Sequence, residues 1–131
     1  MIDAAAALAD LLDGTPGLDL GDNLFLGLRR SADPDLPAAS VFLQNTGGGP
    51  PTPYFGGGSL YAGGVQALVR GNPDATAAAE ALARAVLERL HTAIPTGCVG
   101  VWAQQSAPYF LGLDSRNCST WSINFTVRWA A

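Results

Sequence analysis

The chain has 131 residues, of which 48% are hydrophobic and 14% are charged. This balance predicts one folded domain and excludes an intrinsically disordered chain, because enough apolar surface is present to form a core. The net charge is −4, and the seven basic residues are all arginines that are scattered along the sequence. Tight, sequence-specific nucleic-acid binding is not expected, since it requires clustered basic charge.

The sequence also argues against a membrane partner. No stretch reaches the ~20 apolar residues of a membrane-spanning helix. The apolar run from Met1 to Leu12 contains Asp3 and Asp10 and has no preceding basic segment, so it does not match a secretory signal. We therefore expect a protein that is made and assembled in a cytoplasm.

The first elements are short. Asp3 is placed to cap a helix over Ala4–Leu12. A strand is predicted at Leu24–Arg29, and two prolines mark a turn at Ser31–Pro37. A second strand is predicted at Val41–Gln44.

A glycine- and proline-rich segment follows at residues 45–58. It holds six glycines and three prolines around the adjacent aromatic residues Tyr54 and Phe55. Glycine costs backbone entropy and proline removes a hydrogen-bond donor, so the segment is not expected in the core. It is either a disordered linker or an arm that is ordered by contact with another molecule. The adjacent aromatic residues favour the arm.

The second half starts with a long strand at Leu60–Arg70, with a bulge expected at Gly63–Gly64. Asn72 then resembles an N-cap and opens a helix over Pro73–Ala93. Its apolar stripe recurs at helical spacing through Leu82, Val86 and Leu90.

Two further strands are predicted at Cys98–Gln105 and Trp121–Trp129. The second alternates strictly between apolar and polar residues, so one face is core and the other polar. In the first, the same alternation buries Val99, Val101 and Ala103. It places Cys98, Trp102 and Gln104 on the opposite face.

These elements predict an α+β fold in one domain over residues 1–131. Its single, largely antiparallel sheet carries two helices on one face, in the order α-β-β-β-α-β-β. The outer face of the sheet would then carry Gln66, Arg70, Trp102, Gln104, Asn124 and Thr126. A face poor in Lys and Glu that contains a Trp is typical of an interface, although a loop of the same chain could also cover it.

The residues that could do chemistry are few. His91 is the single histidine and lies near a predicted helix end, where a cation suits the helix dipole. Cys98 and Cys118 mark opposite ends of a predicted hairpin, too far apart to bridge, and are expected as free thiols. No metal ligand set, phosphate-binding loop or catalytic constellation is found. We expect neither a cofactor nor an enzyme.

Several segments resemble one known family, the tail terminator proteins of long-tailed bacteriophages, which are also described as minor capsid or tail-completion proteins. The likeness starts with V-Q-A-L-V-R-G at residues 65–71, directly before an Ala-rich helix ending in L-E-R-L at residues 87–90. It continues with A-P-Y at 107–109, L-G-L-D at 111–114 and the strand at 119–127 that contains S-I-N-F. The same layout includes the N-terminal helix, the strand at 41–44 and the glycine-rich segment. That segment is longer and richer in Pro than is expected of the family.

The resemblance implies a structural virion protein at the head-proximal end of a tail. Such a protein forms a homo-oligomeric ring, expected to have six copies, that caps the tail tube protein and ends its polymerisation. The ring also joins the tail to the head-tail connector (adaptor) protein. The residues that would contact neighbours are the aromatic pair of the arm and polar or aromatic residues of the outer face, namely Tyr54, Phe55, Gln66, Arg70, Trp102, Gln104 and Asn124.

Three other classes remain open. The chain could be another virion part of similar size, such as a head-closure or tail-tube protein. It could be an α+β domain that binds a small ligand, which would need a pocket lined by buried aromatic residues. It could also be an enzyme whose site has no recognisable pattern.

Overall fold

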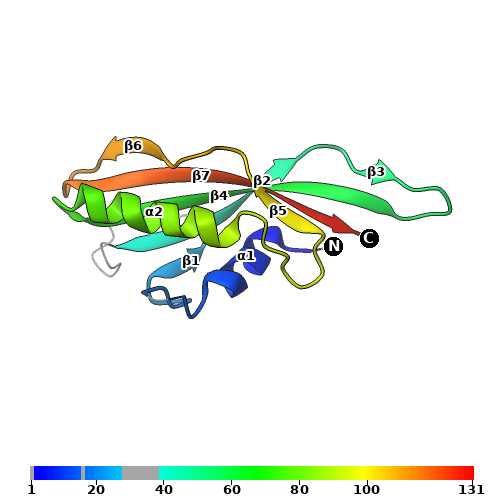
Figure 1. Ribbon diagram of the computed structural model, residues 1–131, viewed down its shortest axis with the longest axis horizontal. Coiled ribbons are helices and arrows are strands. Elements are labelled where there is room, and N and C mark those ends of the chain that lie inside the picture. Colours follow the sequence, from blue (N-terminus) through cyan, green and yellow to red (C-terminus); the bar gives the residue numbers. More distant parts are fainter. Residues whose placement is uncertain (1, 16, 28–38) are drawn as a thin grey trace.

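The computed structural model describes residues 2–15, 17–27 and 39–131, and within them seven strands form one sheet (Figure 1). The predicted α+β class, with two helices and a mostly antiparallel sheet, is confirmed. Two short strands are added to the predicted order. The elements are α1 (Ala4–Leu12), β1 (Leu24–Leu26), β2 (Ser40–Gly48), β3 (Thr52–Pro53), β4 (Ser59–Pro73), α2 (Thr76–Leu90), β5 (Gly100–Ala103), β6 (Tyr109–Leu113) and β7 (Cys118–Ala130).

The two longest strands, β4 and β7, form the centre of the sheet. Its strand order is β1-β2-β4-β7-β5, with β3 paired to β4 and β6 paired to β7. Strand β1 is parallel to β2, and every other pair is antiparallel. Both β5 and β6 lie on the same side of β7, where β6 pairs with its first residues and β5 with its last.

Both helices pack into one core on a single face of the sheet. Alternation along β4 and β7 sends one set of side chains toward the helices, including the fully buried Val65, Ile123 and Phe125. Helix α1 covers β1 and β2, whereas α2 covers β4 and β7. On the other face, the described residues form a small cluster in which the rings of Phe25 and Phe42 stack at 5.6 Å beside Leu68.

Helix α1 begins as predicted. Asp3 is its N-cap, and the carboxylate accepts a hydrogen bond of 3.2 Å from the backbone N–H of Ala6. The strand predicted at Leu24–Arg29 ends at Leu26, and Gly27 follows with φ of +81°. The rest of that prediction, including the turn at Ser31–Pro37, lies outside the described residues.

Helix α2 begins three residues later than predicted. Asn72 and Pro73 still belong to β4, because Pro73 pairs with Cys118 of β7. The chain leaves the strand at Asp74, which has a left-handed φ of +58°, and the helix starts at Thr76 without a side-chain cap. Pairing with the long strand β7 therefore overrides the local helix-start signal of Asn72-Pro73.

The strand predicted at Cys98–Gln105 is confirmed only in its centre. It pairs with β7 over Gly100–Ala103, and Val101 is fully buried as expected. Val99 precedes the strand and is 52% exposed, contrary to the prediction.

His91 is the C-cap of α2, and its Nδ1 accepts a hydrogen bond of 3.0 Å from the N–H of Ala103. This histidine joins the helix end to β5.

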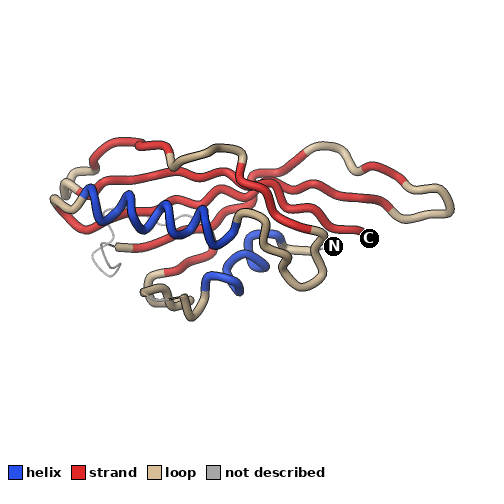
Figure 2. Tube along the Cα trace, viewed as in Figure 1, coloured by secondary structure: helices blue, strands red, loops and turns tan. Residues whose placement is uncertain are grey.

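The glycine-rich segment extends the sheet. Residues 45–64 form a long hairpin, here called the arm, made from the end of β2, β3, a turn and the start of β4 (Figure 2). The segment stays out of the core as predicted, but it pairs as strands instead of forming a structureless loop. The expected bulge is displaced: the register shift falls in β2 between Asn45 and Gly47, opposite Gly64.

Candidate interaction surfaces

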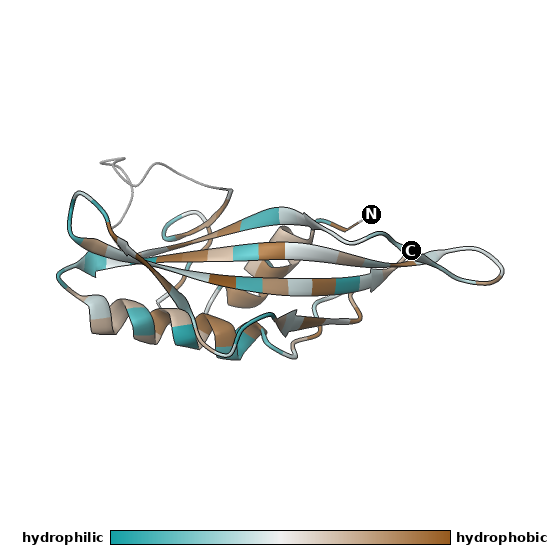
Figure 3. Cartoon of the chain, turned by 90° about the horizontal axis from the view of Figure 1, so that it is seen from above, coloured by the Kyte–Doolittle hydropathy of each residue, from teal (hydrophilic) through white to brown (hydrophobic). Residues whose placement is uncertain are grey.

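The arm projects along the sheet beyond both helices (Figures 1 and 3). Its base is fixed to β7, since the rings of Tyr61 and Trp129 stack with centroids 5.6 Å apart. At its tip, the N–H of Tyr54 donates to the carbonyl of Gly58 at 3.0 Å and closes a turn. Phe55, in this turn, is fully exposed, and Tyr54 is 47% exposed. The arm is thus held at one end and presents aromatic rings at the other.

The glycines of the arm allow its strands to approach closely. A Cβ on Gly48 would lie 2.0 Å from the carbonyl oxygen of Ala62 on the paired strand. A Cβ on Gly63 would lie 2.9 Å from the ring of Trp129, which crosses this position. Both contacts are inside van der Waals distance. At Gly48 the Cβ would meet backbone, so only glycine fits, and at Gly63 the ring of Trp129 would have to shift.

No charged residue occurs between Leu36 and Val69, a stretch that contains the whole arm. In the colouring by hydropathy the projecting part of the arm is mostly pale, whereas hydrophilic residues recur along α2 (Figure 3). Exposed sheet extensions are usually protected from association by charged side chains. The arm lacks this protection, so its surface is suited to contact with another molecule.

The outer face of the sheet is partly closed by its own chain. Gln105 reaches over β7, where its Nε2 donates to the carbonyl of Ser122 at 2.8 Å and its Oε1 accepts from the N–H of Asn124 at 3.0 Å. Gln66 donates to the hydroxyl of Ser122 at 3.2 Å. Gln66 and Asn124 are consequently half-buried. The sequence placed Gln105 as the last residue of a strand, whereas β5 ends at Ala103 and leaves Gln105 free to cross the outer face.

Trp102 and Gln104 are on the outer face, as the alternation predicts. Trp102 is 40% exposed, and the guanidinium of Arg128 lies over its ring at 5.0 Å. Gln104 is exposed and donates to the hydroxyl of Thr126 at 3.0 Å. Of the predicted site residues, these two and the tip pair are accessible.

Arg70 is not accessible, in contrast to the expectation for the outer face. It is 2% exposed, and its Nε forms an ion pair of 2.9 Å with the carboxylate of Asp114. Burial raises the pKa of Asp114, but hydrogen bonds from the N–H groups of Cys118 and Arg116, together with Arg70, outweigh it and lower the pKa below the ordinary value. Arg70 therefore holds the turn after β6 against the sheet.

Strand β6 forms an apolar edge that the sequence did not reveal. Its side chains Tyr109, Phe110, Leu111 and Leu113 are 61%, 52%, 57% and 54% exposed. Phe110 tilts against the buried Trp121 at 5.1 Å, which anchors the strand. The prediction treated residues 106–117 as a connection between strands. The run Y-F-L-G-L was the signal that could have identified a strand.

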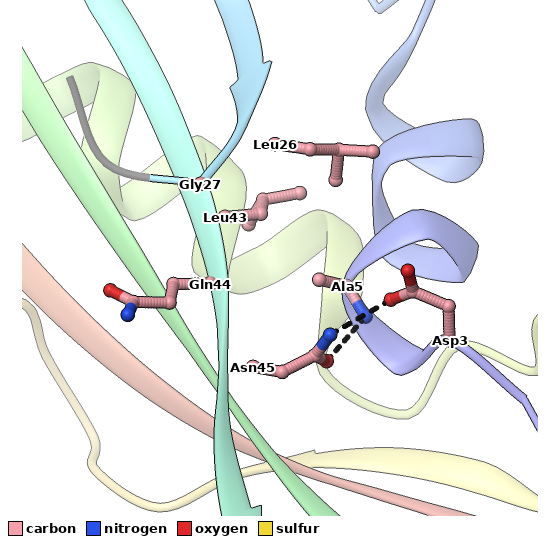
Figure 4. A pocket seen from close by; sticks show the side chains of 7 residues that line it. All are labelled: Asp3, Ala5, Leu26, Gly27, Leu43, Gln44 and Asn45. Carbon is pink, nitrogen blue, oxygen red and sulfur yellow. Dashed lines mark hydrogen bonds between the residues drawn. The ribbon is translucent and has the colours of Figure 1, made fainter.

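A cavity of about 390 Å³ lies between α1 and β2 (Figure 4). Inside it, Asn45 donates to the Asp3 carboxylate at 2.9 Å and accepts from the N–H of Ala5 at 3.0 Å. The hydrogen bond from Asn45, followed by that from Ala6, lowers the pKa of Asp3. The polar groups here thus hold α1 to the start of the arm. Among the described residues, the lining contains no aromatic side chain and consists of Asp3, Ala5, Leu26, Gly27, Leu43, Gln44 and Asn45.

Three titratable side chains, Arg70, Asp114 and Cys118, meet in the part of the chain that the structure describes. Within it, no group of three His, Cys, Asp or Glu residues is placed to hold a metal ion. Cys98 and Cys118 are unpaired; Cys118 is buried, and burial raises the pKa of the Cys98 thiol. Neither described helix has the length and apolar character needed to traverse a bilayer.

Comparison with known proteins gives a likeness of fold. No protein-family model and no curated protein sequence matches the chain. Among solved structures, it is similar to a chain of the "Virion of native gene transfer agent (GTA) particle", with a TM-score of 0.58 and 21% sequence identity. The match covers 98% of this chain and 87% of that one. The two chains thus share a fold over nearly their whole lengths.

Proposed function

We propose that this chain is a structural virion protein of the tail terminator type. In this function, it assembles into a ring of about six copies at the head-proximal end of a tail. The ring caps the tail tube, ends its polymerisation and contacts the head-tail connector. No catalytic step is part of this function.

The observation that carries the proposal is a fold shared with a virion component, combined with apolar surfaces that a free chain would not need. The arm tip and β6 together expose six large apolar side chains. Monomeric proteins rarely display such surfaces without a binding role. The resemblance of residues 65–71 and 107–127 to tail terminators supplies the specific role within the virion. Tyr54, Phe55, Trp102 and Gln104 are the proposed contacts with neighbouring chains.

Removing the reading frame from the genome that produces the particles tests the function directly. Electron microscopy should then show filled heads without tails, together with free tails of uncontrolled length. Particles of normal appearance would contradict the proposal. Complete absence of tail tubes would instead assign the chain to the tail-tube class, and leaking heads with normal free tails would favour head closure.

The purified protein gives an independent test of the ring. Light scattering and negative-stain microscopy should show a monomer or a discrete closed assembly. A terminator has to bind a tube end without offering a second copy of that end, so growth must stop. Open filaments formed by the protein alone would contradict a terminator.

A further inference from the structure

The arm tip and the β6 edge lie at opposite ends of the molecule (Figure 1). Strand β6 pairs with residues 119–122 of β7, whereas the arm pairs with its last residues, Leu60 opposite Ala130. Ser122 and Ala130 are eight residues apart, which is roughly 26 Å at ~3.3 Å per residue. The tip extends further still in the same direction.

The two surfaces cannot meet within one chain. Ser59 and Ala131 exchange backbone hydrogen bonds of 2.7 and 2.9 Å, and the stack of Tyr61 on Trp129 adds a second attachment. Both contacts hold the arm along β7 and pointing away from β6. Any contact between the tip and β6 therefore joins two molecules.

The surfaces match in chemistry. Neither the arm nor the segment at residues 106–113 contains a charged residue. Phe55 offers a fully exposed ring, and β6 offers four apolar side chains that are each more than half exposed. A Cβ on Gly112 would meet nothing within 4 Å, so the edge is open at this position. An aromatic anchor on an apolar, uncharged site is the usual centre of a stable interface.

We propose that the arm tip of one copy, with Tyr54 and Phe55, docks on the β6 edge of the next copy. The contact is heterologous, because it joins two different surfaces. Repetition of such a contact closes into a ring when the rotation between copies allows it. The proposal deepens the proposed function by naming the surfaces that join neighbouring copies, and it rests on that function for the closed ring.

Two double variants separate the surfaces. The tip variant carries Tyr54→Ser and Phe55→Ser, and the edge variant carries Leu111→Ser and Leu113→Ser. All four residues are exposed, so each variant should melt within a few degrees of the unmodified protein. Phe110 is left in place because it packs on Trp121. The control is Ile94→Ser, which changes a residue that is 72% exposed and belongs to neither surface.

Mass photometry and light scattering of the purified proteins provide the readout. The unmodified protein and the control should assemble, whereas each double variant alone should remain monomeric. An equal mixture of the two variants should form one-to-one pairs and no ring. Each pair contains one intact contact, between the tip of the edge variant and the edge of the tip variant.

Each alternative gives a different result. Assembly of the edge variant alone would show that tips or other surfaces join the copies, and assembly of the tip variant alone would show that the tip is dispensable. A mixture that stays monomeric would show that the two surfaces do not bind each other. An unmodified protein that is monomeric at all concentrations would also overturn this inference. The proposed function would then be tested separately, by electron microscopy of particles made from a genome without this reading frame.

Discussion

Arg70 and Asp114 form an ion pair of 2.9 Å between the central strand β4 and the turn that joins β6 to β7. The Arg70 side chain is 3% exposed and that of Asp114 is 13% exposed, so the pair lies under the surface. Asp114 also accepts hydrogen bonds from the N–H groups of Arg116 and Cys118 at 2.9 and 3.0 Å. This one carboxylate thus fixes the turn beside the β6 edge.

Replacing Asp114 with Ala should therefore destabilise the domain. The change leaves the guanidinium of Arg70 buried without its partner, which typically costs ~3–5 kcal/mol, with the lower end expected here because Asp114 is nearer to solvent. Glu80→Ala is the matched control. Its ion pair with Arg84 is exposed on α2 and should contribute only about 0.3–0.5 kcal/mol. Urea unfolding of the three proteins measures both effects, and equal losses would contradict a structural role for the buried pair.

The same carboxylate predicts a dependence of stability on acid. The pKa of Asp114 in the folded protein lies below its ordinary value. The stability that the ionised Asp114 contributes is therefore complete above its pKa in the unfolded chain. This stability is lost as the pH falls through the lower pKa of the folded protein. Thermal melting from about pH 6 to about pH 2 should show a steeper loss for the unmodified protein than for Asp114→Asn. Parallel curves would show that Asp114 is not linked to acid unfolding.

A pair of glycine substitutions tests the close pairing of the arm. Gly48→Ala places a Cβ 2.0 Å from the carbonyl oxygen of Ala62, so the strands must separate. Gly49→Ala meets nothing within 4 Å and serves as the control. Amide hydrogen exchange should increase across residues 45–64 in the first variant and remain unchanged in the second, while exchange in α1 and α2 stays the same in both. Unchanged exchange in Gly48→Ala would mean that the arm is not paired as described.

An element could be predicted from the sequence where no pairing between distant residues competed with the local pattern. The helix at Ala4–Leu12 was predicted with its exact bounds, since Asp3 caps it locally and nothing opposes it. The strict alternation of β7 also identified its buried face. The start of α2 was misplaced because the pairing of Pro73 with Cys118 is a contact between distant residues. Local signals do not report such contacts.

The candidate surfaces show the same limit. The aromatic pair at Tyr54 and Phe55 was found because it interrupts a glycine- and proline-rich segment. The strand β6 was missed because its short apolar run lies between turns, and its exposure depends on its position at the sheet edge. Arg70 was expected on an open face because alternation gives the direction of a side chain but not what covers it. Asp114, 44 residues away along the chain, covers it.

Two tryptophans provide the last test, since they lie on opposite faces of the sheet. Trp121 is 8% exposed and packs between Phe110 and the helix-side core, whereas Trp102 is 40% exposed beneath Arg128. Trp121→Ala should cost ~3–5 kcal/mol, as expected for a core aromatic residue. Trp102→Ala should cost only about 1 kcal/mol, mainly the loss of its contact with Arg128. Assembly should show the opposite order, because Trp102 is one of the proposed contacts between copies and interface tryptophans often dominate binding. Melting curves and sizing of both variants measure the two effects. If Trp102→Ala unfolds like a core deletion while Trp121→Ala is silent, the register of β7 is displaced by one residue, and the proposed interface is the core.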